Sequence, residues 1–148
     1  MIYKYNDGGR SKYFKGRCGD CVVRAISIAT DKDYKEIYDL LHQRQKEWAN
    51  KSRSKAALRC RKNPSPRAGV WKQVYNPLIE ELGFRWVSTC EVGSSDRTYL
   101  TRGGTSLPKG TLIVKTRRHL QCVKDHVLHD TQPLSNFGSM VYGYWIKS

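Results

Sequence analysis

Apolar side chains form an almost continuous run shortly after residue 20 of the chain. The run reads CVVRAISIAT over residues 21–30 and leaves almost no polar face. A helix that is apolar nearly all round is normally buried on every side. The pattern therefore predicts a buried helix that begins close to Cys21.

Helical spacing continues in two later segments. After Asp33, aromatic and aliphatic side chains recur at i, i+3, i+4 and i+7, which predicts an amphipathic helix running to about Trp48. The segment VWKQVYNPLIEEL, residues 70–82, also has helical spacing, and Gly83 marks its end. The Asn-Pro pair at residues 76–77 either kinks this helix or begins another one.

From residue 84 onward the spacing changes from helical to short runs rich in β-branched and aromatic residues. The candidate strands are residues 84–92, 111–115, 119–123, 127–130 and 140–146, separated by Gly, Pro, Ser and Asn. The N-terminal residues are polar and contain glycine, and we expect them to form an arm. Helices followed by strands predict an α+β fold in which a C-terminal antiparallel sheet follows the N-terminal helices.

The length of the chain limits how many cores it can form. With 148 residues, of which 39% are apolar, we expect a single domain over residues 1–148 with a basic insertion or loop at about residues 49–69. No segment has the roughly 20 apolar residues of a membrane span, and the N-terminus lacks the apolar core of a signal peptide. We therefore expect a cytoplasmic protein without a membrane partner, whose five cysteines are thiols.

The formal charge of +14 favours an acidic partner. From Arg44 to Lys72, ten basic residues accompany a single acid, Glu47. This segment either follows the phosphates of a nucleic acid or is a solvated insertion, and the sequence leaves both interpretations open. The candidate residues for contact with nucleic acid or an acidic partner are Lys51, Arg53, Lys55, Arg59, Arg61 and Lys62.

Two cysteines, Cys18 and Cys21, stand three residues apart at the start of the predicted buried helix. A zinc site needs about four ligands, and the sequence has no second C-x-x-C and no H-x-x-x-H. A redox pair of the thioredoxin type needs a preceding strand, and a polar arm precedes Cys18. Cys21 is therefore either an ordinary buried cysteine or a nucleophile activated by the helix N-terminus, and we expect neither a metal nor a cofactor.

A partner for Cys21 is found in the segment GTLIVKTRRHLQCVKDHVLHDT, residues 110–131. Two short strands flank a turn near residues 125–126, and an even number of loop residues places His119 on the same face as Asp130 and diagonal to it. An odd number shifts the register by one and brings His129 to that face instead. A histidine oriented by a carboxylate acts as a general base.

The order of these motifs resembles the papain-like cysteine peptidase superfamily. The chain has a Cys at the start of a helix in GDCVVRAISIA, a His opening a strand in RRHLQCV, and an Asp ending the next in VLHDT. Among small bacterial and phage members, it is most similar to the bacteriocin-leader peptidases. The segment at residues 107–131, followed by YGYW, also resembles phage-encoded proteins of this type. The likeness extends from about Gly16 to Trp145, outside the basic segment.

The resemblance implies a papain-like fold in which the central helix carries the nucleophile. It implies Cys21 as the nucleophile, His119 as the base and then the acid, and Asp130 as the group that orients the imidazole. The family usually has a Gln about six residues before the Cys as an oxyanion donor, and Lys15 stands there in this chain. Lys15 and the backbone N–H of Cys21 are the candidate donors.

Together these observations predict a cysteine-dependent acyl-transfer enzyme that forms a thioester, a peptidase or amidase if water resolves it. The substrate is then a peptide or amide, which the positive charge suggests is acidic. The alternative is a papain-like domain without catalysis that binds nucleic acid or an acidic host protein. The aromatic residues either line a cleft or fill the core; they include Trp71, Trp86, Tyr99, Tyr142 and Trp145.

Overall fold

The computed structural model describes residues 1–16, 18–90, 93, 97–100, 106–134 and 139–147. Along the chain, the helices are η1 (Arg10–Lys12), α1 (Cys21–Thr30), α2 (Tyr34–Lys51), α3 (Lys55–Lys62), η2 (Pro66–Ala68) and α4 (Lys72–Glu81). The strands are β1 (Ile2–Tyr5), β2 (Phe84–Ser88), β3 (Thr98–Leu100), β4 (Thr111–Thr116), β5 (His119–Lys124), β6 (Val127–Asp130), β7 (Ser139–Val141) and β8 (Gly143–Lys147). The predicted α+β class is confirmed.

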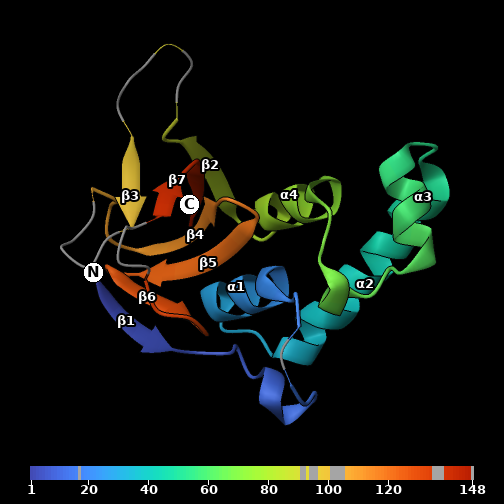
Figure 1. The fold of residues 1–148 in the computed structure, drawn as a ribbon, viewed down its shortest axis with the longest axis horizontal. Coiled ribbons are helices and arrows are strands. Elements are labelled where there is room, and N and C mark those ends of the chain that lie inside the picture. Colours follow the sequence, from blue (N-terminus) through green and yellow to red (C-terminus); the bar gives the residue numbers. More distant parts are fainter. Residues whose placement is uncertain (17, 91–92, 94–96, 101–105, 135–138, 148) are drawn as a thin grey trace.

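The centre of the fold is a six-stranded sheet with the order β1-β6-β5-β4-β8-β2. Helix α1 packs on one face of the sheet, and its apolar residues share a core with α2, α4 and the inward side chains of β4, β5 and β8. A second core lies on the opposite face, where the small β3-β7 sheet covers β4, β5 and β6. Figure 1 shows α1 beside the sheet and α3 at the far end of α2.

The C-terminal strands of this sheet pair antiparallel, as predicted, but the sheet as a whole is mixed because the N-terminal segment joins it. The N-terminal segment, expected to be an arm, forms β1 and pairs parallel to β6, with Ile2 opposite Val127 and Tyr5 opposite Asp130. Strand β1 lies at the sheet edge and is mostly exposed, so it lacks the alternation that identifies a half-buried strand. Pairing with a segment more than 100 residues away decides its conformation.

The predicted buried helix is α1, which begins at Cys21 and is followed by Asp31 in the left-handed conformation (φ 56°). Val23 and Ile26 have no exposed surface. Helix α2 begins as predicted, because the Asp33 side chain accepts a hydrogen bond from the backbone N–H of Lys35. It continues three residues past the predicted end at Trp48.

The prediction of a loop at residues 49–69 is wrong, because this segment contains α3. The Ser54 hydroxyl caps the helix by accepting a hydrogen bond from the Ala57 backbone N–H at 3.1 Å. Ala57 and Cys60 lie three residues apart and are buried against α2, where the Cys60 thiol approaches the Gln45 carbonyl. Only small residues form the apolar stripe of α3, and the many charges around it conceal the helical period.

The predicted helix at residues 70–82 is α4, and Pro77 lies inside it without dividing it in two. The helix is followed by Gly83 with φ 93°, as expected for a helix stop. The strand predicted at residues 84–92 is β2 over Phe84–Ser88, and residues 91–92 lie outside the described part. The run predicted at residues 140–146 forms two strands, β7 and β8, on either side of Tyr142.

Gly143 in β8 lies where two strands approach closely, and Gly143→Ala is expected to destabilise the protein. A Cβ atom at this position would overlap the Trp86 ring and lie 2.8 Å from the Val87 carbonyl oxygen. Such overpacking typically costs about 1–3 kcal/mol in the free energy of unfolding, which urea denaturation measures. In the Trp86→Leu background, where the ring that the new Cβ would overlap is absent, adding Gly143→Ala should lower the free energy of unfolding by less than it does in the wild type. Equal stability of Gly143→Ala and wild type would contradict this close packing.

Candidate active site

Cys21 is the first residue of α1 and is partly exposed. The preceding residue, Asp20, is the N-cap of the helix, but its carboxylate does not cap the helix N–H groups. The N-terminal end of a helix carries partial positive charge, which stabilises a thiolate. The local sequence therefore places Cys21 where a thiolate is favoured.

His119 and Asp130 reach the site from a single hairpin. The strands β5 and β6 are joined by Asp125 and His126, which both have positive φ angles of 47° and 65°, as in a tight two-residue turn. Val123 then pairs with Leu128, so the register predicted for an even loop is confirmed. His119 opens β5 and Asp130 ends β6.

The imidazole of His119 lies between a carboxylate and a thiol. Its Nε2 atom is 2.7 Å from Oδ2 of Asp130, so the contact expected from the even register is confirmed. The His119 ring also interacts with the thiol of Cys21, since each of the two groups shifts the pKa of the other. Because Asp130 occupies Nε2, Nδ1 is the ring nitrogen left for Cys21. The three side chains therefore form a Cys–His–Asp sequence of contacts.

These contacts change the acidity of the thiol and the imidazole in opposite directions. Burial acts to raise the pKa of Cys21, but hydrogen bonds from His119 and the Leu120 backbone, with the positive charges of His119 and Arg24, lower this pKa below its usual value. Burial acts to lower the pKa of His119, but the hydrogen bond and charge of Asp130 and the contact with Cys21 raise it to about 9. Because the pKa of Cys21 is lowered and that of His119 is raised to about 9, the proton is favoured on the imidazole between the two pKa values, which gives a thiolate–imidazolium pair in that pH range.

Arg24 connects the cysteine helix to the carboxylate of the site. It is located one turn after Cys21 on α1, and its Nη1 atom lies 3.2 Å from Oδ1 of Asp130. The same nitrogen donates a hydrogen bond to the hydroxyl of Thr131. Asp130 thus has one oxygen on His119 and the other on Arg24, which fixes the plane of the carboxylate.

A second carboxylate, Asp20, is completely buried beneath the site. Its Oδ1 atom lies 3.0 Å from Nη1 of Arg10 and 3.0 Å from Nε of Arg24. Its Oδ2 atom accepts a hydrogen bond from the Tyr34 hydroxyl at 2.6 Å. Burial and this contact raise the pKa of Tyr34, so the phenol stays protonated and donates. The two arginines and the two carboxylates, Asp20 and Asp130, balance one another in charge.

The triad opens into a cavity of about 690 Å³. Cys21, His119 and Asp130 line it together with residues 68–72, before and at the start of α4, and residues 131–132, directly after β6. A second hollow of about 340 Å³ shares Lys72, Tyr75 and Lys115 with it. Three of the five aromatic candidates line these spaces, namely Trp71, Trp86 and Trp145.

The assignment of Lys15 or the Cys21 backbone N–H as the oxyanion donor stays a prediction. The Lys15 side chain is exposed, and Gly16, not Lys15, is among the residues that line the cavity. The backbone carbonyl of Lys15 accepts a hydrogen bond from Arg67 at 3.4 Å. The backbone N–H of Cys21 stays the other candidate donor, since it belongs to the unpaired first turn of α1.

The residues that support the triad were missed by the sequence analysis. Arg24 is the single charged residue within α1, and a charge within an apolar run is a signal of a buried ion pair. Asp20 and Arg10 carry no such signal, because nothing in the spacing of the chain relates η1 to α1. Lys115 is similarly undistinguished, since a Lys near the end of a strand is common at a sheet surface.

The other cysteines occupy different surroundings. Cys18 lines the same cavity as Cys21, and its thiol is close enough to the Arg67 guanidinium to raise the pKa of that group. Cys60 and Cys122 are buried, which raises the pKa of each thiol, that of Cys122 to about 12. All five cysteines are free thiols. Within the described residues, no group of three or more His, Cys, Asp or Glu side chains could hold a metal ion.

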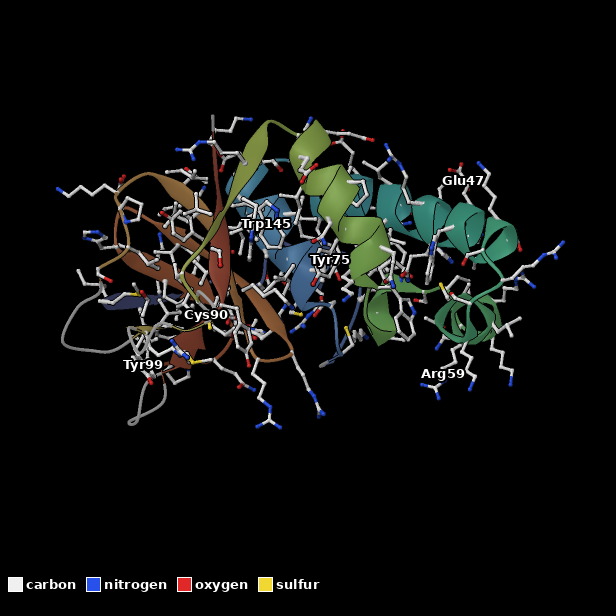
Figure 2. All side chains as sticks on the ribbon, turned by 90° about the horizontal axis from the view of Figure 1, so that it is seen from above. Glu47, Arg59, Tyr75, Cys90, Tyr99 and Trp145 are labelled. Atoms are coloured by element: carbon white, nitrogen blue, oxygen red, sulfur yellow. The ribbon has the colours of Figure 1, made fainter. Side chains whose placement is uncertain are left out.

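The basic candidate residues lie away from this cavity. All six are exposed, Lys51 at the end of α2, Arg53 between the two helices and the other four on α3. Arg61 donates hydrogen bonds to carbonyls at the C-terminal end of α2, including that of Ser52 at 3.1 Å. Arg59 points outward from α3 in Figure 2.

Comparisons with known proteins find no match: no protein-family model, no curated protein and no solved structure is similar to the chain. Among the helices of the described segments, none is sufficiently long and apolar to cross a membrane.

Proposed function

We propose that the protein is a cysteine-dependent acyl-transfer enzyme of papain-like type, a peptidase or amidase. The observation that carries this proposal is the position of His119, which contacts the Cys21 thiol on one side and Asp130 on the other. The raised pKa of His119, about 9, and the lowered pKa of Cys21 supply both a nucleophile and a proton donor near neutral pH. The proposal places the protein in a reducing cytoplasm, where Cys21 stays reduced and forms no disulfide.

The reaction follows from the protonation states of the pair. The Cys21 thiolate attacks the carbonyl carbon of an amide and forms a C–S bond, while the imidazolium of His119 gives its proton to the leaving nitrogen as the C–N bond breaks. A thioester on Cys21 results. His119, now neutral, removes a proton from water as the water attacks the thioester, and the carboxylic acid and the starting thiolate–imidazolium pair are formed.

Asp130 and Arg24 take part without contacting the reacting carbonyl. The carboxylate of Asp130 stabilises the imidazolium and holds the ring with one nitrogen toward Cys21. Arg24 positions that carboxylate from the opposite side. Oxyanion donors contribute about 10²- to 10³-fold in rate, and Lys15 and the Cys21 backbone N–H are proposed for this role.

Iodoacetamide labelling across pH, with mass spectrometry of each cysteine-containing peptide, tests the nucleophile. Cys21 is expected to react faster than the other cysteines below pH 7, because its pKa is lowered. Cys60 and Cys122 serve as buried comparators, and Cys90 as a partly exposed one. A Cys21 rate no higher than that of Cys90 would count against the proposal.

Acyl transfer itself is tested with p-nitrophenyl acetate. The expected result is a burst of p-nitrophenol with a transient acetyl group on Cys21, which disappears as the thioester hydrolyses. The Cys21→Ala variant should show neither, and Cys90→Ala should behave as wild type. Acetylation that is slow and equal at all exposed cysteines contradicts an enzyme that uses Cys21.

A second candidate function is binding of nucleic acid or an acidic host protein through α3. The exposed residues Lys51, Arg53, Lys55, Arg59 and Lys62 favour it, because within the described part of the chain none of them is in an ion pair. Binding to single- or double-stranded DNA should then fall steeply with salt and be unaffected by Cys21→Ala. Salt-independent binding, or none, excludes DNA as the partner of this surface.

A further inference from the structure

The cavity around the triad has an uncompensated positive charge. Of its lining residues, Arg10 and Arg24 are paired with the carboxylates Asp20 and Asp130. Cys21 and His119 balance each other as thiolate and imidazolium.

Three further cations line the same cavity, Lys72, Lys115 and Arg118, and the described residues provide no ion-pair partner for any of them. The adjoining hollow adds one acid, Glu80, so the combined space keeps a positive excess. A concave site lined by one sign of charge concentrates ligands of the opposite sign.

Lys115 has the central position among these cations. It pairs with Leu120 on β5, the residue after His119, and with Gly143 on β8. Residues directly opposite each other point to the same face of a sheet, so Lys115 points to the face on which Leu120 packs against α1. Its ammonium group lies 5.8 Å from the centre of the Tyr75 ring on α4. Lys115 therefore stands where the two hollows meet, one residue along the sheet from the catalytic histidine.

The second hollow continues from Lys115 along an aromatic wall. The Tyr75 ring meets the Trp145 ring edge to face at 6.0 Å, and Figure 2 shows these two side chains together between α4 and the sheet. The Trp86 ring packs against the Trp145 ring at a tilt of 57°, with 4.5 Å between the ring centres, and Trp86 is 40% exposed, which is unusual for so large an apolar side chain. The space beyond Lys115 is thus suited to a further residue of an extended substrate.

We propose that the site selects an acidic substrate, a peptide or amide with a carboxylate close to the reacting carbonyl, and that Lys115 pairs with this carboxylate. The inference rests on the proposed function, because it names the substrate class of the same cysteine. Lys72 and Arg118 add to the attraction from the rim of the cavity, where both are exposed. An ammonium that is partly buried over a tyrosine ring is less screened by salt than one in open solvent.

Two alkylating agents of nearly the same size test this proposal, iodoacetate with a negative charge and iodoacetamide without one. The measured quantity is the ratio of the iodoacetate rate to the iodoacetamide rate at Cys21, obtained by peptide mapping at pH 7 and low salt. In the folded protein this ratio is expected to exceed that of the same chain unfolded in urea by about 3- to 10-fold, since one uncompensated charge a few ångströms away contributes roughly 1 kcal/mol.

The Lys115→Met variant should lose most of this excess, because it keeps an unbranched side chain and removes the charge. Lys109→Met removes the same charge from an exposed position before β4, at the opposite end of that strand, and should keep the ratio. Raising the ionic strength to 1 M should reduce the excess in wild type.

This experiment distinguishes failure of the proposed function from failure of the proposed acidic substrate. Slow iodoacetamide alkylation of Cys21 counts against the nucleophile, and therefore against the proposed function, whatever the ratio is. Fast iodoacetamide alkylation with a ratio equal to that of the unfolded chain, or with a ratio that Lys115→Met and Lys109→Met change equally, overturns the acidic substrate and leaves the nucleophile in place.

Discussion

His119→Ala is expected to lower the rate of acyl-enzyme formation on Cys21 from an amide substrate by about 10²- to 10⁴-fold, the range typical for a group that transfers a proton in the transition state. The variant removes the proton donor for the leaving group and the charge that stabilises the thiolate. Alkylation of Cys21 by iodoacetamide at pH 6–7 should fall as well, because the pKa of the thiol then rises.

The pH profile distinguishes this role from a structural one. The protonated imidazole is the acid of the first step, and its pKa of about 9 means that wild-type acylation should decrease as the pH rises through about 9. At the low-pH end, acylation should decrease as Cys21 becomes protonated, below the pH expected for an ordinary thiol because the pKa of Cys21 is lowered. The decrease near pH 9 should be absent in His119→Ala.

Two further variants complete this test. Asp130→Asn keeps the shape of the side chain and removes its charge, so the pKa of His119 should fall. The decrease in acylation at high pH should then begin at a lower pH than in the wild type. His129→Ala, on the same strand as Asp130 but hydrogen-bonded to Asn6, is the matched control and should keep the wild-type profile. Equal losses in His119→Ala and His129→Ala would show that the hairpin acts only as a support.

Arg24→Met is expected to cost about 3–5 kcal/mol in the free energy of unfolding, the usual consequence of removing one member of a buried ion pair. Arg24 is 7% exposed and is shared by two carboxylates, Asp20 and Asp130. Without it, Asp20 keeps Arg10 as its cation, while Asp130 keeps only His119. The variant therefore leaves buried negative charge with too little compensation.

Urea denaturation of wild type, Arg24→Met and Arg59→Met measures this effect. Arg59 is exposed on α3, so Arg59→Met should change stability by no more than about 0.5 kcal/mol. If Arg24→Met does not fold, Arg24→Lys serves in its place. Arg24→Lys should be destabilised by less than Arg24→Met because it keeps the positive charge. It should still be less stable than the wild type, because an ammonium group lacks the guanidinium fork that contacts both carboxylates. Losses below about 1 kcal/mol in both Arg24 variants would contradict the importance of this network.

The helical half of the fold follows from local patterns in the sequence. The apolar run after Cys21 and the helical spacing after Asp33 each identify a helix and its buried face. An apolar helix surface must pack against the rest of the protein to be removed from water. Helix α3 was missed because its apolar stripe consists of small residues among many basic ones. Strand β1 was missed because it is an exposed edge strand that is held by parallel pairing with β6.

Some residues of the candidate site are indicated by local sequence, and others are not. The nucleophile is indicated by its position at the start of α1, and the histidine and aspartate by a hairpin whose two-residue turn sets the register. Both are consequences of local geometry over a short stretch of chain. Arg10, Asp20 and Lys115 gave no such indication, because their importance depends on neighbours from other elements.

By itself, the sequence determined the α+β class and the buried cysteine helix, and it limited the hairpin to two registers, one of which places His119 diagonal to Asp130, since periodicity is a local property. Only the tertiary structure decided which register the hairpin adopts, that this hairpin contacts the start of α1, that Arg24 and Asp20 balance the charge beneath it, and that Lys115 stands beside it with no ion-pair partner among the described residues. The physical reason is that the protonation state of a group and the charge of a cavity depend on every element packed around them. No spacing along the chain records those contacts.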